Sequence, residues 1–257
     1  MKNTIEYMKN KSKEAVSYFN KFMLNQKFSI PENGHSYEKL LVAMEKIIPF
    51  EAPDFYSIVG NTIYIFEHFE FDSSPNTRKG SQNRIEINKD IKKFKESFCN
   101  NPNADGTEIY KGELIVKQSI TNYMKNLASA FENHYQKIKH YKENILEHIN
   151  CDNDKKFDFV VTFLIEDVSI FGSIYFDKES KLLLPIFVKE FVDLWKKKLN
   201  VDNIICSAET NENKKNTYIV SKNDFVYLNR MSIPMEQIKQ FGFNPKSIWM
   251  RIITPFK

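Results

Sequence analysis

Glycine is scarce in this chain, with 7 residues in 257. The scarcity argues against a nucleotide-binding fold built on glycine-rich loops, and no Walker loop, dinucleotide fingerprint or G-x-S-x-G elbow is present. The three cysteines are odd in number and widely spaced, which favours reduced thiols and supplies no zinc knuckle. The first ten residues lack the apolar core of a signal peptide, and no apolar run reaches the roughly 18 residues of a membrane span. We therefore expect a cytoplasmic protein without a membrane partner.

Hydrophobic and aromatic residues are abundant instead. The chain is 42% hydrophobic and has 22 phenylalanines and 12 tyrosines, a globular composition. Its net charge of +4 and pI near 8.7 allow a polyanionic partner without requiring one. The length favours a single α/β domain over 1–257. The alternative is a division of the chain at the polar segment 150–156 into two sub-lobes, 1–150 and 151–257.

Hydrophobic spacing predicts five helices, over residues 4–28, 37–48, 117–149, 185–199 and 234–241. A short helix over 89–95 is expected between two loops. The apolar runs at 157–167 and 201–209 are typical of buried strands. With a helix between them, these two strands predict a parallel pair, unless a hairpin partner at 171–176 intervenes. The segments NTYIV and DFVYL are expected to add edge strands.

A β-hairpin is predicted where FYSIV and TIYIFEHFEF flank the turn residues Gly60-Asn61. Counting outward from that turn, Asp54 faces Glu67 at the end of an apolar stripe. Two like charges in this relation destabilise a hairpin by up to about 1 kcal/mol. A bound divalent cation reverses the penalty, because Mg²⁺ takes carboxylate oxygens. The alternative is an exposed hairpin end whose four acids, Asp54, Glu67, Glu70 and Asp72, are solvated charges.

Pro53-Asp54, twelve further residues and then Glu67 resemble the signature of the PD-(D/E)XK nuclease superfamily. The resemblance implies a restriction-endonuclease-like αβββαβ core with helical additions, in which Asp54 and Glu67 bind Mg²⁺ or Mn²⁺. It also implies a further acid from the preceding helix, for which Glu38 and Glu45 are the candidates. The family places a lysine two positions after the second acid to help activate water, and this chain has Phe69 there. A lysine that has migrated to another position, Lys79 or Lys117, is the replacement we consider.

Positive charge is concentrated just after the hairpin, at Arg78, Lys79, Arg84, Lys89, Lys92, Lys93 and Lys95. Lysine and arginine replace the counterions of a phosphate backbone, and the hydroxyl of Ser81 adds a hydrogen bond to phosphate. We predict that Arg78, Lys79, Ser81 and Arg84 bind nucleic acid, with a solvated loop as the ordinary alternative.

The remaining polar features are weaker. Glu166 and Asp167 end the strand over 157–167, but neighbouring residues of a strand point to opposite faces, so at most one can face a common site. His68 is either a general base beside Glu67 or a histidine packed on the back face of the hairpin. The histidines of the helix over 117–149, His134, His140 and His148, lack the i, i+4 spacing of a metal pair and are assigned to the surface or the core edge.

These features predict an α/β fold with a mixed central sheet, a β-hairpin and flanking helices. The predicted function is a divalent-metal-dependent nuclease that hydrolyses phosphodiester bonds of DNA, in a restriction or phage-defence setting that rests on the resemblance alone. Asp54 and Glu67 hold the metal, and Lys79 steadies the scissile phosphate. Two alternatives stay open: a non-catalytic nucleic-acid- or protein-binding module on a degenerate nuclease fold, and a hydrolase of small phosphorylated molecules. A protein partner or a homo-oligomer is compatible with each.

Overall fold

A computed structural model describes residues 28–29, 37–73, 89, 107–112, 119–149, 156–167, 169, 173–176, 179–182, 184–209, 215–240 and 248–253. The helix predicted over 4–28 lies outside these residues, apart from a short strand at its end. The helix predicted over 89–95 also lies outside them, except for residue 89, which is helical.

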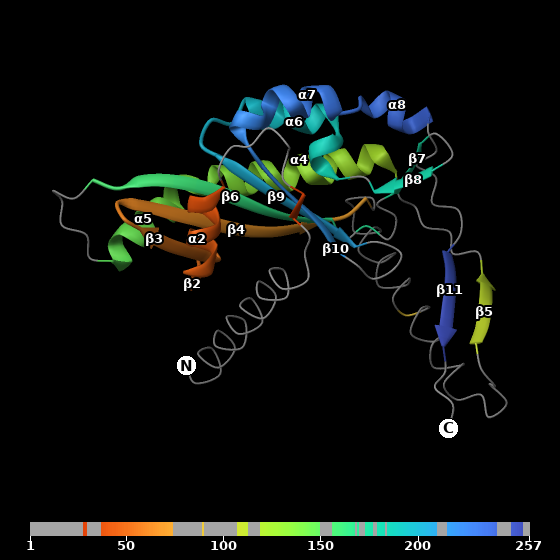
Figure 1. The fold of residues 1–257 in the computed structure, drawn as a ribbon, viewed down its shortest axis with the longest axis horizontal. Coiled ribbons are helices and arrows are strands. Elements are labelled where there is room, and N and C mark those ends of the chain that lie inside the picture. Colours follow the sequence, from red (N-terminus) through yellow and green to blue (C-terminus); the bar gives the residue numbers. More distant parts are fainter. Residues whose placement is uncertain are drawn as a thin grey trace.

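A mixed sheet of seven strands forms the centre of the described structure, in the order β1-β10-β9-β6-β4-β3-β2 (Figure 1). Its strands are β1 (Phe28–Ser29), β2 (Ile48–Pro49), β3 (Phe55–Val59), β4 (Thr62–Phe71), β6 (Asp158–Asp167), β9 (Asn203–Glu209) and β10 (Lys215–Ser221). Strand β6 pairs in parallel with β4 on one side and with β9 on the other. The β2–β3, β3–β4 and β9–β10 pairs are antiparallel. The predicted α/β class with a mixed central sheet is confirmed.

The helices connect and cover this sheet. They are α2 (Glu38–Glu45), α4 (Ile120–Gln136), α5 (Ile138–His148), α6 (Lys189–Lys196), α7 (Phe225–Met231) and α8 (Met235–Gln240), with 3-10 turns η1 (Pro185–Phe187) and η2 (Lys222–Asp224). Two separate antiparallel pairs complete the described elements, β5 (Thr107–Gly112) with β11 (Ile248–Ile253), and β7 (Ser173–Phe176) with β8 (Glu179–Leu182). Because β7 pairs with β8 and not with β6, the predicted parallel pairing of β6 with β9 is confirmed.

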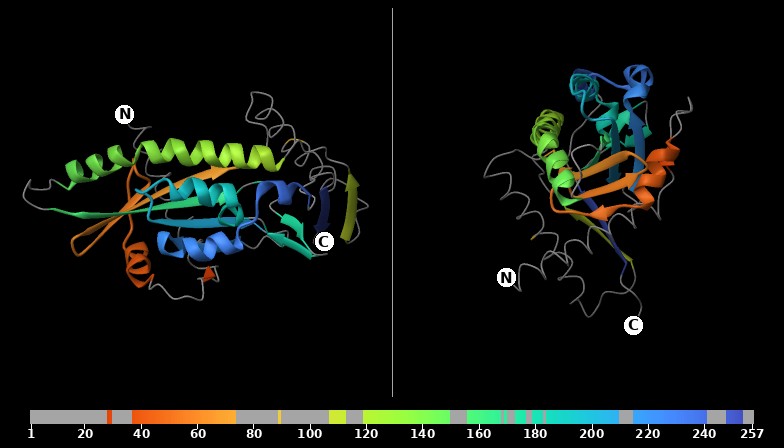
Figure 2. Two further views of the ribbon diagram at one scale, coloured as in Figure 1. Left: turned by 90° about the horizontal axis from the view of Figure 1, so that it is seen from above. Right: turned by 90° about the vertical axis from the view of Figure 1, so that its left-hand side faces the viewer.

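Each face of the sheet carries its own hydrophobic core. On one face, alternate residues of β3, β4, β6 and β9 pack against buried residues of α4, α5, α6, α7 and α8. On the opposite face, α2 packs against Phe55, Tyr64, Phe66, Leu164 and Ile205. Figure 2 shows α4 and α6 side by side along the strands and α2 set apart from them. Tyr56, Ile63 and Ile65 of the hairpin therefore point toward the face of the sheet that carries the larger core.

The first described helix is shorter than predicted. Spacing alone extended it to Ile48, whereas α2 ends at Glu45 and Ile48 begins β2 with 44% of its surface exposed. Proline disfavours helical geometry in the residue before it, so Pro49 places Ile48 in an extended conformation. Ile48 therefore does not continue the buried face of the helix predicted over 37–48.

Two further elements differ from the sequence prediction. The helix predicted over 117–149 is divided at Lys137 into α4 and α5, although the buried stripe continues across the division. The segment DFVYL, predicted as an edge strand, begins α7. Here Ser221 and Asp224 form a capping box, which starts a helical turn directly after β10.

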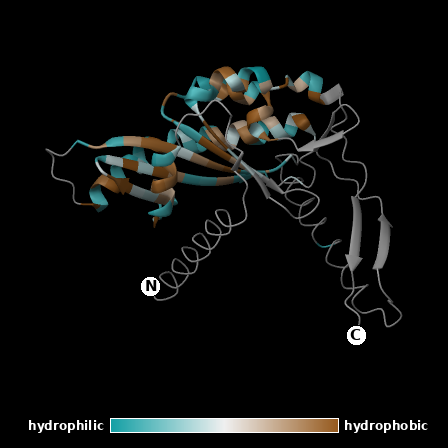
Figure 3. Cartoon of the chain, viewed as in Figure 1, coloured by the Kyte–Doolittle hydropathy of each residue, from teal (hydrophilic) through white to brown (hydrophobic). Residues whose placement is uncertain are grey.

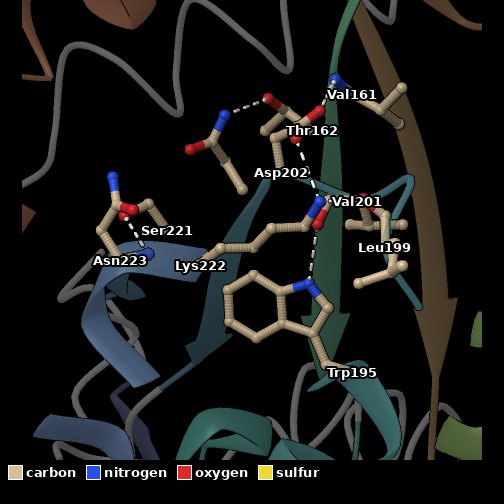
Figure 4. Close-up of polar contacts among 10 residues, drawn as sticks. Val161, Thr162, Trp195, Leu199, Val201, Asp202, Ser221, Lys222 and Asn223 are labelled. Carbon is tan, nitrogen blue, oxygen red and sulfur yellow. Dashed lines mark hydrogen bonds and ion pairs between the residues drawn. The ribbon is translucent and has the colours of Figure 1, made fainter. Parts of the chain in front are cut away.

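Asp202 fixes the start of the parallel pairing between β6 and β9 (Figure 4). One of its carboxylate oxygens accepts a hydrogen bond from the Val161 amide at 2.9 Å, and its own amide donates to the Val161 carbonyl at 2.8 Å. The other carboxylate oxygen is 3.1 Å from Lys222 Nζ, which also donates to the Leu199 carbonyl. Trp195 of α6, fully buried, donates from its indole nitrogen to the Val201 carbonyl at 3.0 Å. The turn between α6 and β9 is thus held by its own Asp202 and by the side chains of Trp195 and Lys222.

Hydrophobic and hydrophilic residues alternate along α6 and α7 in Figure 3, as expected for helices with one buried face. Among the helices of the described residues, none has the length and hydrophobicity that crossing a membrane requires.

Phe131 tests the larger core. Its ring is fully buried and lies edge-on to Phe163 of β6 at 5.3 Å and to Phe191 of α6 at 5.4 Å. We predict that Phe131→Ala lowers the free energy of unfolding by about 3–5 kcal/mol, because it removes buried surface and leaves a cavity. Val226→Ala, at a residue that is 67% exposed, is the control and changes it by less than about 0.5 kcal/mol. Urea denaturation measures both, and equal effects of the two changes contradict this account of the core.

Candidate functional site

The predicted hairpin register is confirmed. Val59 pairs with Thr62 next to the Gly60-Asn61 turn, and the ladder runs to Phe55 opposite Phe66. One step further, Asp54 lies beside Glu67, and its amide donates to Glu67 Oε2 at 3.2 Å. Glu67 lies on the face of β4 that packs against α4 and α5, between Ile65 and Phe69. The sequence therefore brings this acidic pair together, and the fold places it beside two helices.

Glu67 is a buried carboxylate, with a relative exposure of 6%. Three donors reach it. Tyr141 of α5 donates its hydroxyl to Oε1 at 2.5 Å, His134 Nδ1 of α4 is 2.7 Å from the same oxygen, and the Asp54 amide reaches Oε2. Burying a charge is costly unless hydrogen bonds replace the lost water, and these contacts provide that replacement. Burial and the hydrogen bond to Glu67 raise the pKa of Tyr141, so its hydroxyl stays a proton donor.

Asp54 is half-buried at the same end of the hairpin. Its Oδ2 accepts a hydrogen bond from the His68 amide at 2.8 Å. Burial, and after it the neighbouring charge of Glu67, raises the pKa of Asp54, and the hydrogen bond from His68 opposes the rise. A carboxylate that is buried beside a second acid in this way is stabilised by either a proton or a cation between the two.

The remaining acceptor positions decide whether the pair fits a metal. A carboxylate offers about four acceptor positions. Glu67 has a position left on Oε2, and Asp54 Oδ1 has no hydrogen bond from the described residues. One oxygen from each acid suits Mg²⁺, which is usually held by one or a pair of carboxylates and keeps several other ligands. Each of the two acids thus has an oxygen available to a cation.

His134 is the residue of this site that sequence reasoning missed, since it was assigned to the surface or core edge. Its ring stacks on Phe69 with centroids 4.7 Å apart and planes 13° from parallel. Because an ionised Glu67 only accepts hydrogen bonds, Nδ1 is the donor in the short contact, and in the neutral imidazole Nε2 is then the acceptor. No local pattern reveals this partner, because His134 is 67 residues from Glu67. The one available signal was a polar residue at a core position of the 117–149 stripe.

A pocket of about 780 Å³ opens next to this site. The segment before Asp54 and one side of α5 line it, with Phe50, Glu51, Ala52, His140, Asn144, Glu147 and His148. Asn144 donates to the Ala52 carbonyl at 3.1 Å, which ties α5 to the chain just before Asp54. The ring of His148 lies 5.0 Å from that of Phe50. His140 and His148, assigned to the surface or core edge, therefore line a hollow.

The other predicted site residues fall into two groups. Arg78, Lys79, Ser81, Arg84 and Lys117 lie outside the described residues, so their predicted roles stay predictions. Glu38 and Glu45 are exposed on α2, which packs on the opposite face of the sheet from Glu67. The structure does not bring these two glutamates to the acidic pair.

The second acidic pair is divided between the two faces, as strand alternation predicts. Asp167 follows Ile165 on the face of α4 and is 3% exposed, whereas Glu166 shares the other face with His68. Burial raises the pKa of Asp167 to about 7, although its carboxylate accepts a hydrogen bond from the Ser169 amide at 2.8 Å. His68 points away from the Glu67 side chain, so the back-face alternative describes it.

No family model, no curated protein and no solved structure matches this chain.

Tyr141→Phe tests the support of Glu67. The change removes one donor from a buried carboxylate, and we predict a loss of about 1–3 kcal/mol in the free energy of unfolding. Tyr135→Phe, in α4, is the matched control, because the Tyr135 hydroxyl makes no hydrogen bond with the described residues. Denaturant unfolding measures both variants. A Tyr141→Phe protein as stable as the Tyr135→Phe protein rules out the stabilising hydrogen bond.

The pKa of Asp167 predicts a pH dependence of stability. The folded state holds a proton on Asp167 up to about pH 7, whereas an unfolded aspartate releases it near pH 3.8. The free energy of unfolding therefore falls as the pH rises from 4 to about 7, by up to about 4 kcal/mol, since one pKa unit corresponds to about 1.4 kcal/mol. Asp167→Asn removes this dependence and is more stable than the wild type at pH 8. Exposed Asp158 on the same strand supplies the control, Asp158→Asn. Unfolding curves in EDTA-containing buffer at several pH values measure it, and parallel profiles of wild type and Asp167→Asn would refute it.

Proposed function

We propose that this protein is a divalent-metal-dependent nuclease that hydrolyses phosphodiester bonds, with DNA as the expected substrate. The observation that carries the proposal is the convergence of Asp54, Glu67 and His134 at one end of the hairpin. It joins two facing carboxylates to an imidazole whose Nε2 has no partner among the described residues.

The order of elements supports the proposal. Helix α2 is followed by the antiparallel strands β2, β3 and β4 and, after β5 of a separate pair, by α4 and α5 and then by β6, which is parallel to β4. The restriction-endonuclease-like αβββαβ core has one helix, three strands, a helix and a strand in that order. Asp54 directly precedes the second strand of this series, and Glu67 lies in the third. The PD-(D/E)XK resemblance implies its two acids on these strands, and this agreement supports the proposal.

The acidic pair would hold the metal. Asp54 Oδ1 and Glu67 Oε2 are the oxygens with acceptor positions left among the described residues. Burial, and after it the charge of Glu67, raises the pKa of Asp54, and a bound cation would favour its ionised form. A bound Mg²⁺ or Mn²⁺ would supply Lewis-acid stabilisation of the charge that develops on the phosphate oxygens. The hydrogen bonds from Tyr141 and His134 orient Glu67 toward this task.

His134 replaces the missing lysine in the proposal. Phe69 occupies the lysine position, and His134 is stacked directly on its ring. In the hydrolysis, a water oxygen bonds to phosphorus as the bond from phosphorus to the leaving oxygen breaks. Nε2 of His134 takes the water proton, and Glu67 stabilises the resulting imidazolium through Nδ1. The leaving oxygen takes a proton from solvent.

One observation favours the non-catalytic alternative. Protein donors occupy three of the acceptor positions of Glu67, so the carboxylate is satisfied without a metal, and no lysine stands at position 69. On this reading the hairpin is a degenerate site, and the basic segment after it binds nucleic acid or a protein.

The test is cleavage of linear DNA, circular DNA and RNA with Mg²⁺ or Mn²⁺. We expect Asp54→Ala, Glu67→Ala and His134→Gln each to lower the metal-dependent rate by about 100-fold or more. Asp158→Asn, an acid at the other end of the sheet, serves as the control and retains the rate. Cleavage that persists unchanged in Asp54→Ala and Glu67→Ala excludes the hairpin from the reaction.

DNA binding and kinetic measurements distinguish the nuclease from the non-catalytic binding module. If the wild type does not cleave but binds DNA in a salt-sensitive way, and Lys79→Ala with Arg84→Ala removes that binding, the non-catalytic module is correct. A slower rate in His134→Gln with unchanged KM supports proton transfer by His134, whereas a higher KM at unchanged kcat assigns it to substrate binding.

A further inference from the structure

The opposite face of β4 carries a second group of metal-ligating residues. His68 and Glu70 of β4 and Glu166 of β6 each offer one ligand atom, and these atoms all lie within 4.8 Å of one another. His68 Nε2 is 3.3 Å from Glu166 Oε2. We propose that His68, Glu70 and Glu166 form a binding site for a divalent transition metal, Zn²⁺ foremost, that links β4 to β6. This site goes beyond the proposed nuclease function and lies on the other face of the sheet from Asp54 and Glu67.

The backbone dictates the convergence. Strands β4 and β6 are parallel neighbours, with His68 opposite Leu164 and Glu70 opposite Glu166. Side chains two residues apart on a strand share a face, so His68 and Glu70 point to the side on which Leu164 packs with Phe66 and α2. The three side chains therefore lie on the same face of the sheet as the smaller core, next to it and nearer to the carboxyl ends of the two strands.

The charges favour a cation at this position. Glu70 and Glu166 stand directly opposite each other on neighbouring strands, where two like charges are destabilising. Glu166 is only 6% exposed, so water screens its charge poorly. A divalent ion bound by both carboxylates converts this repulsion into attraction. Exposed Glu70 and the partly exposed His68 leave the group open to solvent, from which an ion enters.

The donor set indicates the class of ion. One imidazole nitrogen and two carboxylate oxygens match the ligands that Zn²⁺ takes, and three protein ligands leave a position for water. Mg²⁺ prefers oxygen ligands alone, which the Asp54–Glu67 pair provides and this group does not. The two sites are therefore expected to differ in the metal they select.

Zinc binding tests the proposal directly. The untagged full chain is stripped with EDTA, desalted, and dialysed against ZnCl₂ in the presence of excess Mg²⁺ at pH 7.5. Mass spectrometry of the metal then gives the stoichiometry and affinity. We expect one Zn²⁺ per chain and an affinity at least about 100-fold weaker in His68→Gln and in Glu166→Gln. Co²⁺ in place of Zn²⁺ is expected to give visible absorption that both variants lose.

Matched variants keep the test decisive. Glu70 is exposed, so Glu70→Gln leaves the fold intact, and we expect it to weaken Zn²⁺ binding by about 10-fold or more. His148→Gln and Glu147→Gln, the same residue types on α5, are expected to bind as the wild type does. Circular dichroism confirms that each variant is folded. Unchanged affinity in Glu70→Gln, His68→Gln and Glu166→Gln overturns the proposal, as does a wild type that retains no Zn²⁺.

Failure of this site is distinguishable from failure of the nuclease function. Asp54→Asn is expected to bind Zn²⁺ with wild-type affinity, since Asp54 is not among the three ligands. A protein that binds Zn²⁺ through His68 and Glu166 but cleaves no nucleic acid contradicts only the nuclease function. Mg²⁺-dependent cleavage by a wild type that retains no Zn²⁺ contradicts only the zinc site.

Discussion

The parallel pairing of β4 with β6 is the constraint on which both polar sites depend. It runs over ten residue pairs, from Thr62 opposite Asp158 to Phe71 opposite Asp167. Since side chains alternate along each strand, this register sends Glu67 to the face covered by α4 and α5 and aligns Glu70 with Glu166 on the other. A slip of one residue would exchange the two faces, so that Glu67 would leave the side of α4 and α5 and side chains of the smaller core would face the larger one. The larger core resists such a slip.

Within that core, the cluster around Glu67 departs from the rule that buried stripes are apolar. His134 and Tyr141 lie on the buried side of α4 and α5, among residues such as Phe131, Ile138 and Ile145. A hydrophobic residue at position 67 would pack without three polar partners. Buried charges with dedicated donors are expensive to maintain, and such departures concentrate at functional sites. Packing alone therefore does not explain why polar residues occupy these positions of the core.

The two faces of β4 are coupled through a single peptide. Glu67 points toward α4 and α5, His68 points toward Glu166, and the His68 amide donates to Asp54. A displacement of the His68 backbone would move both its side chain and the amide that donates to Asp54. The same residue thus contributes its amide to the acidic pair on one face and its imidazole to the second polar group on the other.

The sequence by itself determined the features that depend on neighbouring residues. The two-residue turn at Gly60-Asn61 fixed the hairpin register and with it the meeting of Asp54 and Glu67, and continuous apolar runs identified the buried strands. Even the early end of α2 follows from a local cause, Pro49. Only the tertiary structure decided that His134 reaches Glu67, from 67 residues away, and that Glu70 meets Glu166. Local propensity holds no information on which helix covers which strand, because that choice is made by packing over the whole core.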